Sequence, residues 1–235
     1  MAAGSDLVIE APQPTVLPVA GKGGGFPVRR VYCVGRNYVE HAKEMGFTGR
    51  EPPFFFMKPA DAMLYVAPGA TGEMPYPPGT SNLHHEMELI VAIGTAAQNV
   101  KAANAREHIY GYAVGLDMTR RDLQGEAKKT GRPWEIGKAF DHSGPISQII
   151  PAADVGDIDN ATLTLEVNGE TRQSASIAEL IWNIDEIIEH LTTFWKLMPG
   201  DLIFTGTPAG VAAVEKGDTL KGGVTGVTDI TVKLV

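Results

Sequence analysis

The amino-acid sequence predicts an α+β domain that is rich in strands and has few helices. Short apolar runs of strand length recur along the chain, and turn-forming glycine, proline and asparagine separate them. Helical spacing of apolar residues is clearest at residues 176–191, after a Ser176/Glu179 capping box. A chain of 235 residues, 43% of them hydrophobic, is long enough for one large domain with a substantial core.

The first half of the chain is predicted as follows. Residues 1–27 carry several prolines and a glycine-rich run, so we expect an extended arm that does not pack, followed by a domain over residues 28–235. Residues 28–34 have the pattern of a first strand. A helix is expected over residues 38–45 and a short buried strand over residues 54–57.

The second half continues the pattern. The Asn168-Gly169 pair is the favoured two-residue turn of a β-hairpin and joins two strand patterns. Asn183 with Glu186 makes a second capping box, where a second helix could begin after a break. The remaining expected elements are strands at 83–94, 111–116, 202–204 and within 218–235, with a short helix at 104–110.

Composition excludes several classes of function. A formal net charge of −8 argues against nucleic acid or an anionic membrane as the partner. The sequence has no apolar run of about 18 residues and no recognisable secretory signal. Its single cysteine, Cys33, rules out an internal disulfide and fits a cytoplasmic protein. Cys33 lies in an apolar strand, where a buried, unreactive thiol is expected.

Two carboxylates at the start of the apolar strand suggest a metal site. Side chains alternate along a strand, so Glu86 and Glu88 share one face, with His84 beside them. Adjacent carboxylates repel each other and are costly to bury, and a divalent cation would compensate them. A solvated, polar strand end would explain the same spacing, and the residues alone leave both interpretations open.

Other residues are ambiguous in the same way. His41 and Glu44 are neighbours on one helical face, either as a general-base dyad or as a solvated pair. Asp117 follows an apolar strand, where it could simply cap the next turn. Lys138 lies in an apolar segment and needs a negative partner or ligand. The turn-rich residues 205–210 could hold a carboxylate with their hydroxyls and amides.

Six segments, taken in order, resemble a known family. Together they resemble the fumarylacetoacetate hydrolase superfamily, and within it the small acylpyruvate hydrolases, most of all the fumarylpyruvate hydrolases of gentisate breakdown. The resemblance covers roughly residues 28–235. The segments are residues 34–38 with His41 and Glu44, residues 85–89, residues 116–124, Lys138 with Phe140, residues 167–169, and residues 204–210.

The resemblance implies a set of metal ligands. Glu86, Glu88 and Asp117 are expected to bind Mg²⁺ or Mn²⁺, and an all-carboxylate site without thiolate suits these hard cations. Zn²⁺ with His84 as a further ligand is the less favoured alternative, because the family pattern places the histidines away from the metal. The same resemblance changes the interpretation of Asp117 from cap to ligand.

The resemblance also implies roles around the metal. Lys138 is expected beside the cation as a catalytic residue, with His41 and Glu44 as the dyad that activates water. The substrate carboxylate is expected to contact Arg121, Gln124 and the loop that carries Thr205 and Thr207. A second negative group on the substrate would need another cationic side chain. Candidates for that contact are Arg36 and Lys58.

The implied reaction is hydrolysis of a carbon–carbon bond in an acylpyruvate, such as fumarylpyruvate going to fumarate and pyruvate. The implied fold has mixed sheets curled into a partly open barrel or roll, usually in a homodimer. One alternative is decarboxylation or isomerisation of oxaloacetate or another 2-oxo diacid at the same metal site, which needs no attacking water. A metal-binding scaffold without catalysis is the second alternative, and an assay on 2-oxo acids would distinguish them.

Overall fold

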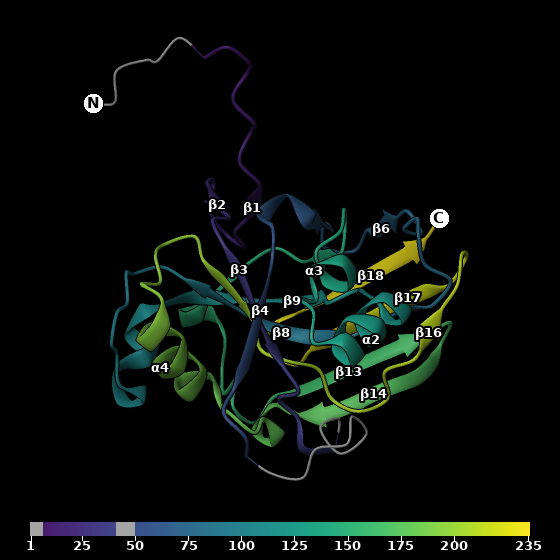
Figure 1. Cartoon of the computed structure of the whole chain (residues 1–235). Helices are drawn as coiled ribbons and strands as arrows, with labels where there is room; N and C mark the ends of the chain where they lie inside the picture. The colour runs from purple at the N-terminus through teal and green to yellow at the C-terminus, as the bar shows by residue number, and fades with distance from the viewer. Residues whose placement is uncertain (1–6, 41–49) are drawn as a thin grey trace.

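The fold is given by a computed structural model that describes residues 7–40 and 50–235 (Figure 1). Two large sheets curve around a common core, and in this view α4 lies to one side while α2 and α3 lie over the middle. This confirms the predicted β-rich α+β class and the strongly curled sheets. Within these two ranges, no helix is long and apolar enough to cross a membrane.

The larger sheet is built from eight strands, and its central strands are the apolar runs of the sequence. β15 lies between β3, to which it is parallel, and β8, to which it is antiparallel. β11 and β5 are also parallel. In spatial order the strands are β4 (Phe54–Lys58), β3 (Val31–Gly35), β15 (Leu202–Phe204), β8 (Met87–Ile93), β9 (Ile109–Leu116), β11 (Gly144–Ile146) and β5 (Met63–Tyr65), with β12 (Ile150–Pro151) paired to β9.

The smaller sheet contains the hairpin that the Asn-Gly pair predicts. Asn168 and Gly169 both have positive φ, 54° and 82°, as the tight turn between β13 and β14 requires. The predicted hairpin is therefore confirmed. The five strands, in spatial order, are β14 (Glu170–Ser176), β13 (Thr162–Val167), β17 (Thr219–Val224), β18 (Thr228–Leu234) and β6 (Thr71–Met74).

The helices begin where the capping boxes predict. Ser176 with Glu179 caps a 3₁₀ turn, η4 (Ile177–Glu179), and Asn183 with Glu186 caps α4 (Ile184–Phe194). The helical stretch is thus divided in two. The other helices are η1 (Ala60–Ala62), η2 (Ala102–His108), α2 (Arg121–Thr130), α3 (Glu135–Lys138) and η3 (Ala152–Asp154). A small sheet joins β10 (Thr119–Arg120), β7 (Leu83–His84) and β16 (Ala213–Val214).

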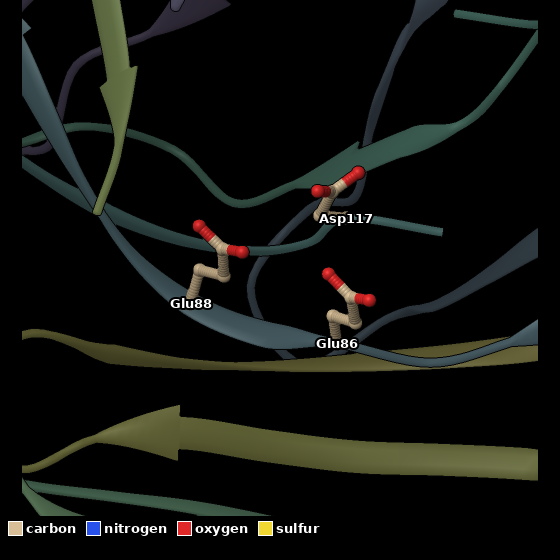
Figure 2. Close-up of side chains that lie close together, drawn as sticks. All are labelled: Glu86, Glu88 and Asp117. Carbon is tan, nitrogen blue, oxygen red and sulfur yellow. The ribbon is translucent and has the colours of Figure 1, made fainter. Parts of the chain in front are cut away.

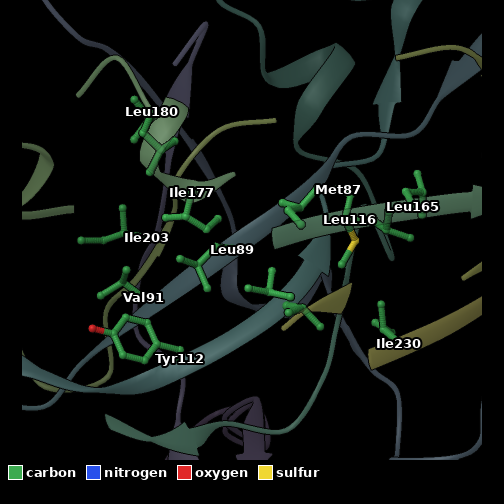
Figure 3. Close-up of a cluster of buried hydrophobic side chains, with 14 of the residues drawn as sticks. Met87, Leu89, Val91, Tyr112, Leu116, Leu165, Ile177, Leu180, Ile203 and Ile230 are labelled. Carbon is green, nitrogen blue, oxygen red and sulfur yellow. The ribbon is translucent and has the colours of Figure 1, made fainter. Parts of the chain in front are cut away.

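β8 separates two hydrophobic clusters because its residues alternate between the two faces of the sheet. Leu89 and Val91 join the cluster between the large sheets, which Figure 3 shows. Ile90 and Ala92 join the second cluster on the opposite face. Glu88 shares the face of Ile90, so the carboxylate lies at the edge of this second cluster rather than between the sheets.

The N-terminal stretch corrects one expectation. We expected residues 1–27 to form an arm that does not pack, but β1 (Val16–Pro18) and β2 (Gly25–Pro27) form a hairpin. Leu17 and Phe26 from this hairpin are buried in the second cluster. Leu17 and Phe26 each lie next to proline or glycine, so the sequence of this stretch did not indicate that they are buried. Residues 7–14 are exposed, and the division at residue 28 stays a prediction.

Candidate metal centre and its pocket

Three carboxylates meet where β8 begins and β9 ends. Because the two strands are antiparallel and Met87 pairs with Leu116, the residues that flank this pair lie side by side. The backbone N–H of Asp117 donates to the carbonyl of Glu86 at 2.8 Å. One oxygen of each of Glu86, Glu88 and Asp117 lies within 4.8 Å of the others, and Figure 2 shows the three carboxylates facing one another.

Cations compensate two of these acids. Lys138 Nζ lies 2.7 Å from Glu86 Oε2 and 2.6 Å from Asp117 Oδ2. Burial alone would lower the pKa of Lys138, but Asp117 and Glu86 raise it above its usual value. Arg121 also pairs with Glu86, and Lys58 Nζ lies 2.8 Å from Asp117 Oδ1. The predicted need of Lys138 for negative partners is confirmed.

Glu88 has the least compensation of the three. It is buried, and its Oε2 accepts a hydrogen bond from the backbone N–H of Gly206 at 2.7 Å. Burial, and after it the charges of Asp117 and Glu86, raises the pKa of Glu88 well above its usual range. A divalent cation among the three carboxylates would remove this cost. The donor set is all oxygen, so the residues present fit Mg²⁺ or Mn²⁺.

His84 does not join this cluster. It lies on β7, and its Nδ1 accepts from Arg121 Nε at 3.4 Å, so its Nε2 proton is directed to Asn82 Oδ1 at 2.9 Å. Burial, followed by the nearby charge of Arg121, lowers the pKa of His84 to about 4. Both ring nitrogens are engaged, which removes the basis for a zinc site with this histidine.

A small pocket opens above the carboxylates. Arg36, with φ of 60°, places its guanidinium 5.3 Å from the centre of the Phe54 ring at one wall. At another wall Arg121 donates to Gln124 Oε1 at 3.3 Å. The lining consists of Val34, Gly35, Arg36, Phe56, Glu86, Glu88, Asp117, Arg121, Gln124, Trp134, Lys138 and Thr207.

Thr205 and Lys58 lie outside that lining. The Thr205 hydroxyl donates to the carbonyl of Leu89 at 2.9 Å, so it is directed to β8. We considered Lys58 as a substrate contact, but its ammonium group is buried behind Asp117 and donates to the carbonyl of Lys138. Its role is to hold Asp117, and the expectation of a substrate contact is corrected.

The loop after β15 reaches the pocket because β15 pairs with β8. Gly206, with φ of 102°, donates its N–H to Glu88, and the Thr207 hydroxyl donates to the carbonyl of Met87 at 2.9 Å. Asn37 Nδ2 donates to the carbonyl of Thr205 at 2.8 Å and ties the loop to the end of β3. The loop therefore supports the metal centre and forms one pocket wall.

Sequence reasoning missed several pocket residues and could not be checked at others. Phe56 and Trp134 form apolar walls, and their rings pack 5.8 Å apart. Lys58 was considered only as a substrate contact, and its place at the end of β4 next to Pro59 does not show that its ammonium group pairs with Asp117. His41 and Glu44 lie outside the described residues, so their role as a dyad stays a prediction.

Comparison with known proteins agrees with this arrangement. The family model for "Fumarylacetoacetate (FAA) hydrolase C-terminal" matches residues 30–235. The crystal structure of fumarylpyruvate hydrolase from Pseudomonas aeruginosa in complex with Mn²⁺ and pyruvate is 52% identical, with a TM-score of 0.96, over 98% of this chain and 99% of that chain. Together with the buried acidic triad, that Mn²⁺ complex confirms the prediction of a Mg²⁺ or Mn²⁺ site.

Curated relatives carry two different activities in their names. The fumarylpyruvate hydrolase of Ralstonia sp is 49% identical over 181 residues, which is 77% of this chain and 92% of the relative. The oxaloacetate tautomerase YcgM of Escherichia coli (strain K12) is 44% identical over 196 residues, 83% of this chain and 88% of the relative. The names of these two relatives do not agree on the reaction.

Proposed function

Because the chain belongs to the fumarylacetoacetate hydrolase family, we propose that it is a metal-dependent hydrolase that converts fumarylpyruvate and water into fumarate and pyruvate. The observation that carries the proposal is a pocket in which a buried acidic triad faces cationic side chains at two separate walls. The full-length similarity to a fumarylpyruvate hydrolase that binds Mn²⁺ and pyruvate supports the choice of substrate.

The pocket charges suit a substrate with two negative ends. Arg121, oriented by His84 and Gln124, would bind the carboxylate of the 2-oxo acid end. Arg36 lies over the rings of Phe54 and Trp134, at 5.3 and 5.9 Å, and would bind the carboxylate of the fumaryl end. A substrate with one carboxylate, such as acetylpyruvate, would use only one of these contacts.

The reaction needs a base for water and a cation near the leaving group. In the proposal, His41, oriented by Glu44, takes a proton from water, which adds to the distal carbonyl carbon. The carbon–carbon bond then breaks, its electron pair forms the pyruvate enolate, and a proton completes pyruvate. Lys138 keeps its proton beside Glu86 and Asp117 and donates a hydrogen bond toward the enolate oxygen. When bound by Glu86, Glu88 and Asp117, Mg²⁺ or Mn²⁺ supplies Lewis-acid polarisation.

A second candidate is the interconversion of the keto and enol forms of oxaloacetate. It is favoured by the names of several relatives, among them YcgM and an Oryza sativa subsp. japonica protein that is 43% identical over 86% of this chain. This reaction, like oxaloacetate decarboxylation, requires enolate stabilisation but no attacking water. Lys138, together with a metal ion held by the carboxylate triad, would supply that stabilisation.

Substrate and metal assays distinguish these reactions. Pyruvate release from fumarylpyruvate, acetylpyruvate and oxaloacetate would be measured with Mg²⁺, with Mn²⁺ and with EDTA, alongside the enol absorbance of oxaloacetate. We expect metal-dependent pyruvate release, fastest from fumarylpyruvate. The hydrolase proposal is wrong if oxaloacetate is tautomerised while no acylpyruvate is cleaved, and the metal role is wrong if EDTA has no effect.

A single variant separates water chemistry from enolate chemistry. H41A should abolish hydrolysis of fumarylpyruvate while oxaloacetate tautomerisation or decarboxylation continues, because only hydrolysis needs activated water. H108A, at a half-buried histidine outside the pocket lining, is the control and should keep both activities. Equal loss of both activities in H41A would show that the proposed division of roles is incorrect.

The oligomeric state also belongs to the proposal. The resemblance implies a homodimer, and light scattering after size-exclusion chromatography should then give twice the chain mass of 25.1 kDa. A mass of one chain at working concentrations would contradict it.

A further inference from the structure

Gln173 is a buried polar residue with an unusually complete set of partners. It lies on β14 in the smaller sheet, outside the pocket lining, and 1% of its surface is exposed. Its Oε1 accepts from the backbone N–H of Met87 at 3.1 Å, and its Nε2 donates to the carbonyl of Pro208 at 2.9 Å. It thus joins the strand between the two glutamates to the loop that forms a pocket wall.

These two partners fix the orientation of the amide. A backbone N–H can only donate and a carbonyl can only accept, so Oε1 must face Met87 and Nε2 must face Pro208. The second N–H of Nε2 then donates to Thr207 Oγ1 at 2.8 Å. Both donors of the amide and one of its acceptor positions are therefore assigned without ambiguity.

The direction of the Thr207 hydroxyl follows. Because Oγ1 accepts from Gln173, its own proton is directed to the carbonyl of Met87, 2.9 Å away. A hydroxyl has one donor and two acceptor positions, so one lone pair remains. Thr207 lines the pocket, and this lone pair is what it offers to a ligand.

The protonation of His85 follows from the same amide. His85 is fully buried, and its Nδ1 lies 3.3 Å from Gln173 Oε1. Since Oε1 carries no proton, Nδ1 must carry one. Gln173 thereby connects His85, the residue before Glu86, to the Thr207 hydroxyl through a single side chain.

The backbone around Gln173 also supports the loop. A Cβ on Gly210 would lie 2.0 Å from the carbonyl oxygen of Arg172, the residue before Gln173. The loop and β14 therefore touch backbone to backbone at this point. The loop that Gln173 contacts is therefore already held against β14.

We propose that Gln173 is a positioning residue of the pocket, which holds the Thr207 hydroxyl so that it accepts a hydrogen bond from a hydroxyl, enol or water of the bound ligand. The proposal rests on the proposed function only in taking the ligand to be a 2-oxo acid or its enol. Gln173 itself touches neither ligand nor metal and works through Thr207.

A double-mutant cycle tests this route. Q173M keeps the length of the side chain and removes its hydrogen bonds, and T207V removes the hydroxyl with little change in shape. We expect Q173M to lower kcat/KM roughly 10- to 100-fold on the 2-oxo acid that the native protein turns over fastest. In the T207V background the same change should cost no more than about threefold, because coupled residues are not additive.

Controls separate this role from general stability. S174A, at the exposed neighbour on the other face of β14, should keep native kcat/KM. T207S, which retains the hydroxyl, should stay closer to the native protein than T207V does. The proposal is overturned if the costs of Q173M and T207V simply multiply in the double variant, since Gln173 would then act by another route.

A second measurement needs neither turnover nor metal. In ¹⁵N spectra of the metal-free, histidine-labelled protein, His85 Nδ1 should be protonated in the native chain and should lose this preference in Q173M. A bare Nδ1 in the native chain would overturn the assignment. Because this readout is independent of the reaction, it stays informative even if neither proposed activity is found.

Discussion

At the scale of single residues, the three buried carboxylates of the metal centre need nearby positive charges. Lys138 was recognisable because it interrupts an apolar segment, whereas Lys58 stands next to Pro59 and could equally have faced solvent. Its ammonium group is buried where it donates to the carbonyl of Lys138, the last residue of α3, and pairs with Asp117. Burial by a helix that is distant in the sequence cannot be predicted from the residues of one strand.

The carboxylate of Glu88 should contribute most directly to metal affinity. E88Q keeps the shape of the side chain but removes the charge of the least compensated of the three acids. We expect the Kd for Mn²⁺, measured by titration calorimetry, to rise by more than the roughly 10- to 100-fold typical of an outer partner. E126Q removes the same charge from an exposed position on α2 and should leave the Kd unchanged. Equal affinities of E88Q and the native protein would exclude Glu88 as a ligand.

Cys33 should be inert in the folded protein. Burial, and after it the charge of Asp117, raises the pKa of its thiol well above the usual range, so the reactive thiolate is scarce at neutral pH. Iodoacetamide near pH 8.5, where an exposed thiol is about half ionised, should modify the unfolded chain and leave the folded chain unmodified. Rapid alkylation without unfolding, seen by mass spectrometry, would show that the thiol is accessible.

At the scale of elements, sequence predicted the strands well and the loop chemistry only in part. The residue types in the loop after β15 indicated a polar binding segment, but they could not show which hydroxyl faces inward. Both hydroxyls donate to carbonyls of β8, Thr205 to Leu89 and Thr207 to Met87, and of the two only Thr207 lines the pocket. Strand alternation does not continue through such a turn, so the direction of each side chain had to come from the structure.

Two glycines make a matched test of this loop. Gly210 and Gly217 have φ of 94° and 97°, but a Cβ on Gly210 would meet the Arg172 carbonyl oxygen at 2.0 Å, whereas nothing lies within 4 Å of one on Gly217. G217A should cost about 1–2 kcal/mol of unfolding free energy from backbone strain alone. G210A should cost about 1–3 kcal/mol more and also reduce turnover. Urea unfolding measures both, and equal costs would show that the close approach is unimportant.

At the scale of the whole molecule, sequence patterns gave the class of fold but not its assembly. The hairpin at Asn168 and the two capping boxes were local features and were predicted correctly, whereas residues 83–94, expected as one strand, are divided into β7 and β8. The order of strands in the larger sheet depends on pairing between residues far apart, such as Leu202 with Val31. The resemblance to a family implied a partly open barrel or roll, but it did not give the strand order.

Metal binding should stabilise the entire domain. Glu86 and Glu88 come from the beginning of β8 and Asp117 from the end of β9, so a cation would link two central strands. At 100 times its Kd, Mn²⁺ should add about 2.7 kcal/mol and raise the Tm by roughly 5–10 °C over the protein in EDTA. The increase should be absent in E88Q. A native Tm that does not respond to Mn²⁺ would contradict a metal site in the folded protein.

The position of β15 in the larger sheet has a consequence for synthesis of the chain on the ribosome. β3 and β4 are translated early, yet they join β8 and β9 only through Leu202–Phe204. Until those residues leave the exit tunnel, the emerging chain holds two incomplete sheet fragments with unpaired strand edges, which are the surfaces that chaperones and aggregation both recognise. A ribosome-stalled chain that lacks residues 202–204 should therefore be sensitive to protease, and one extended well beyond them should become resistant.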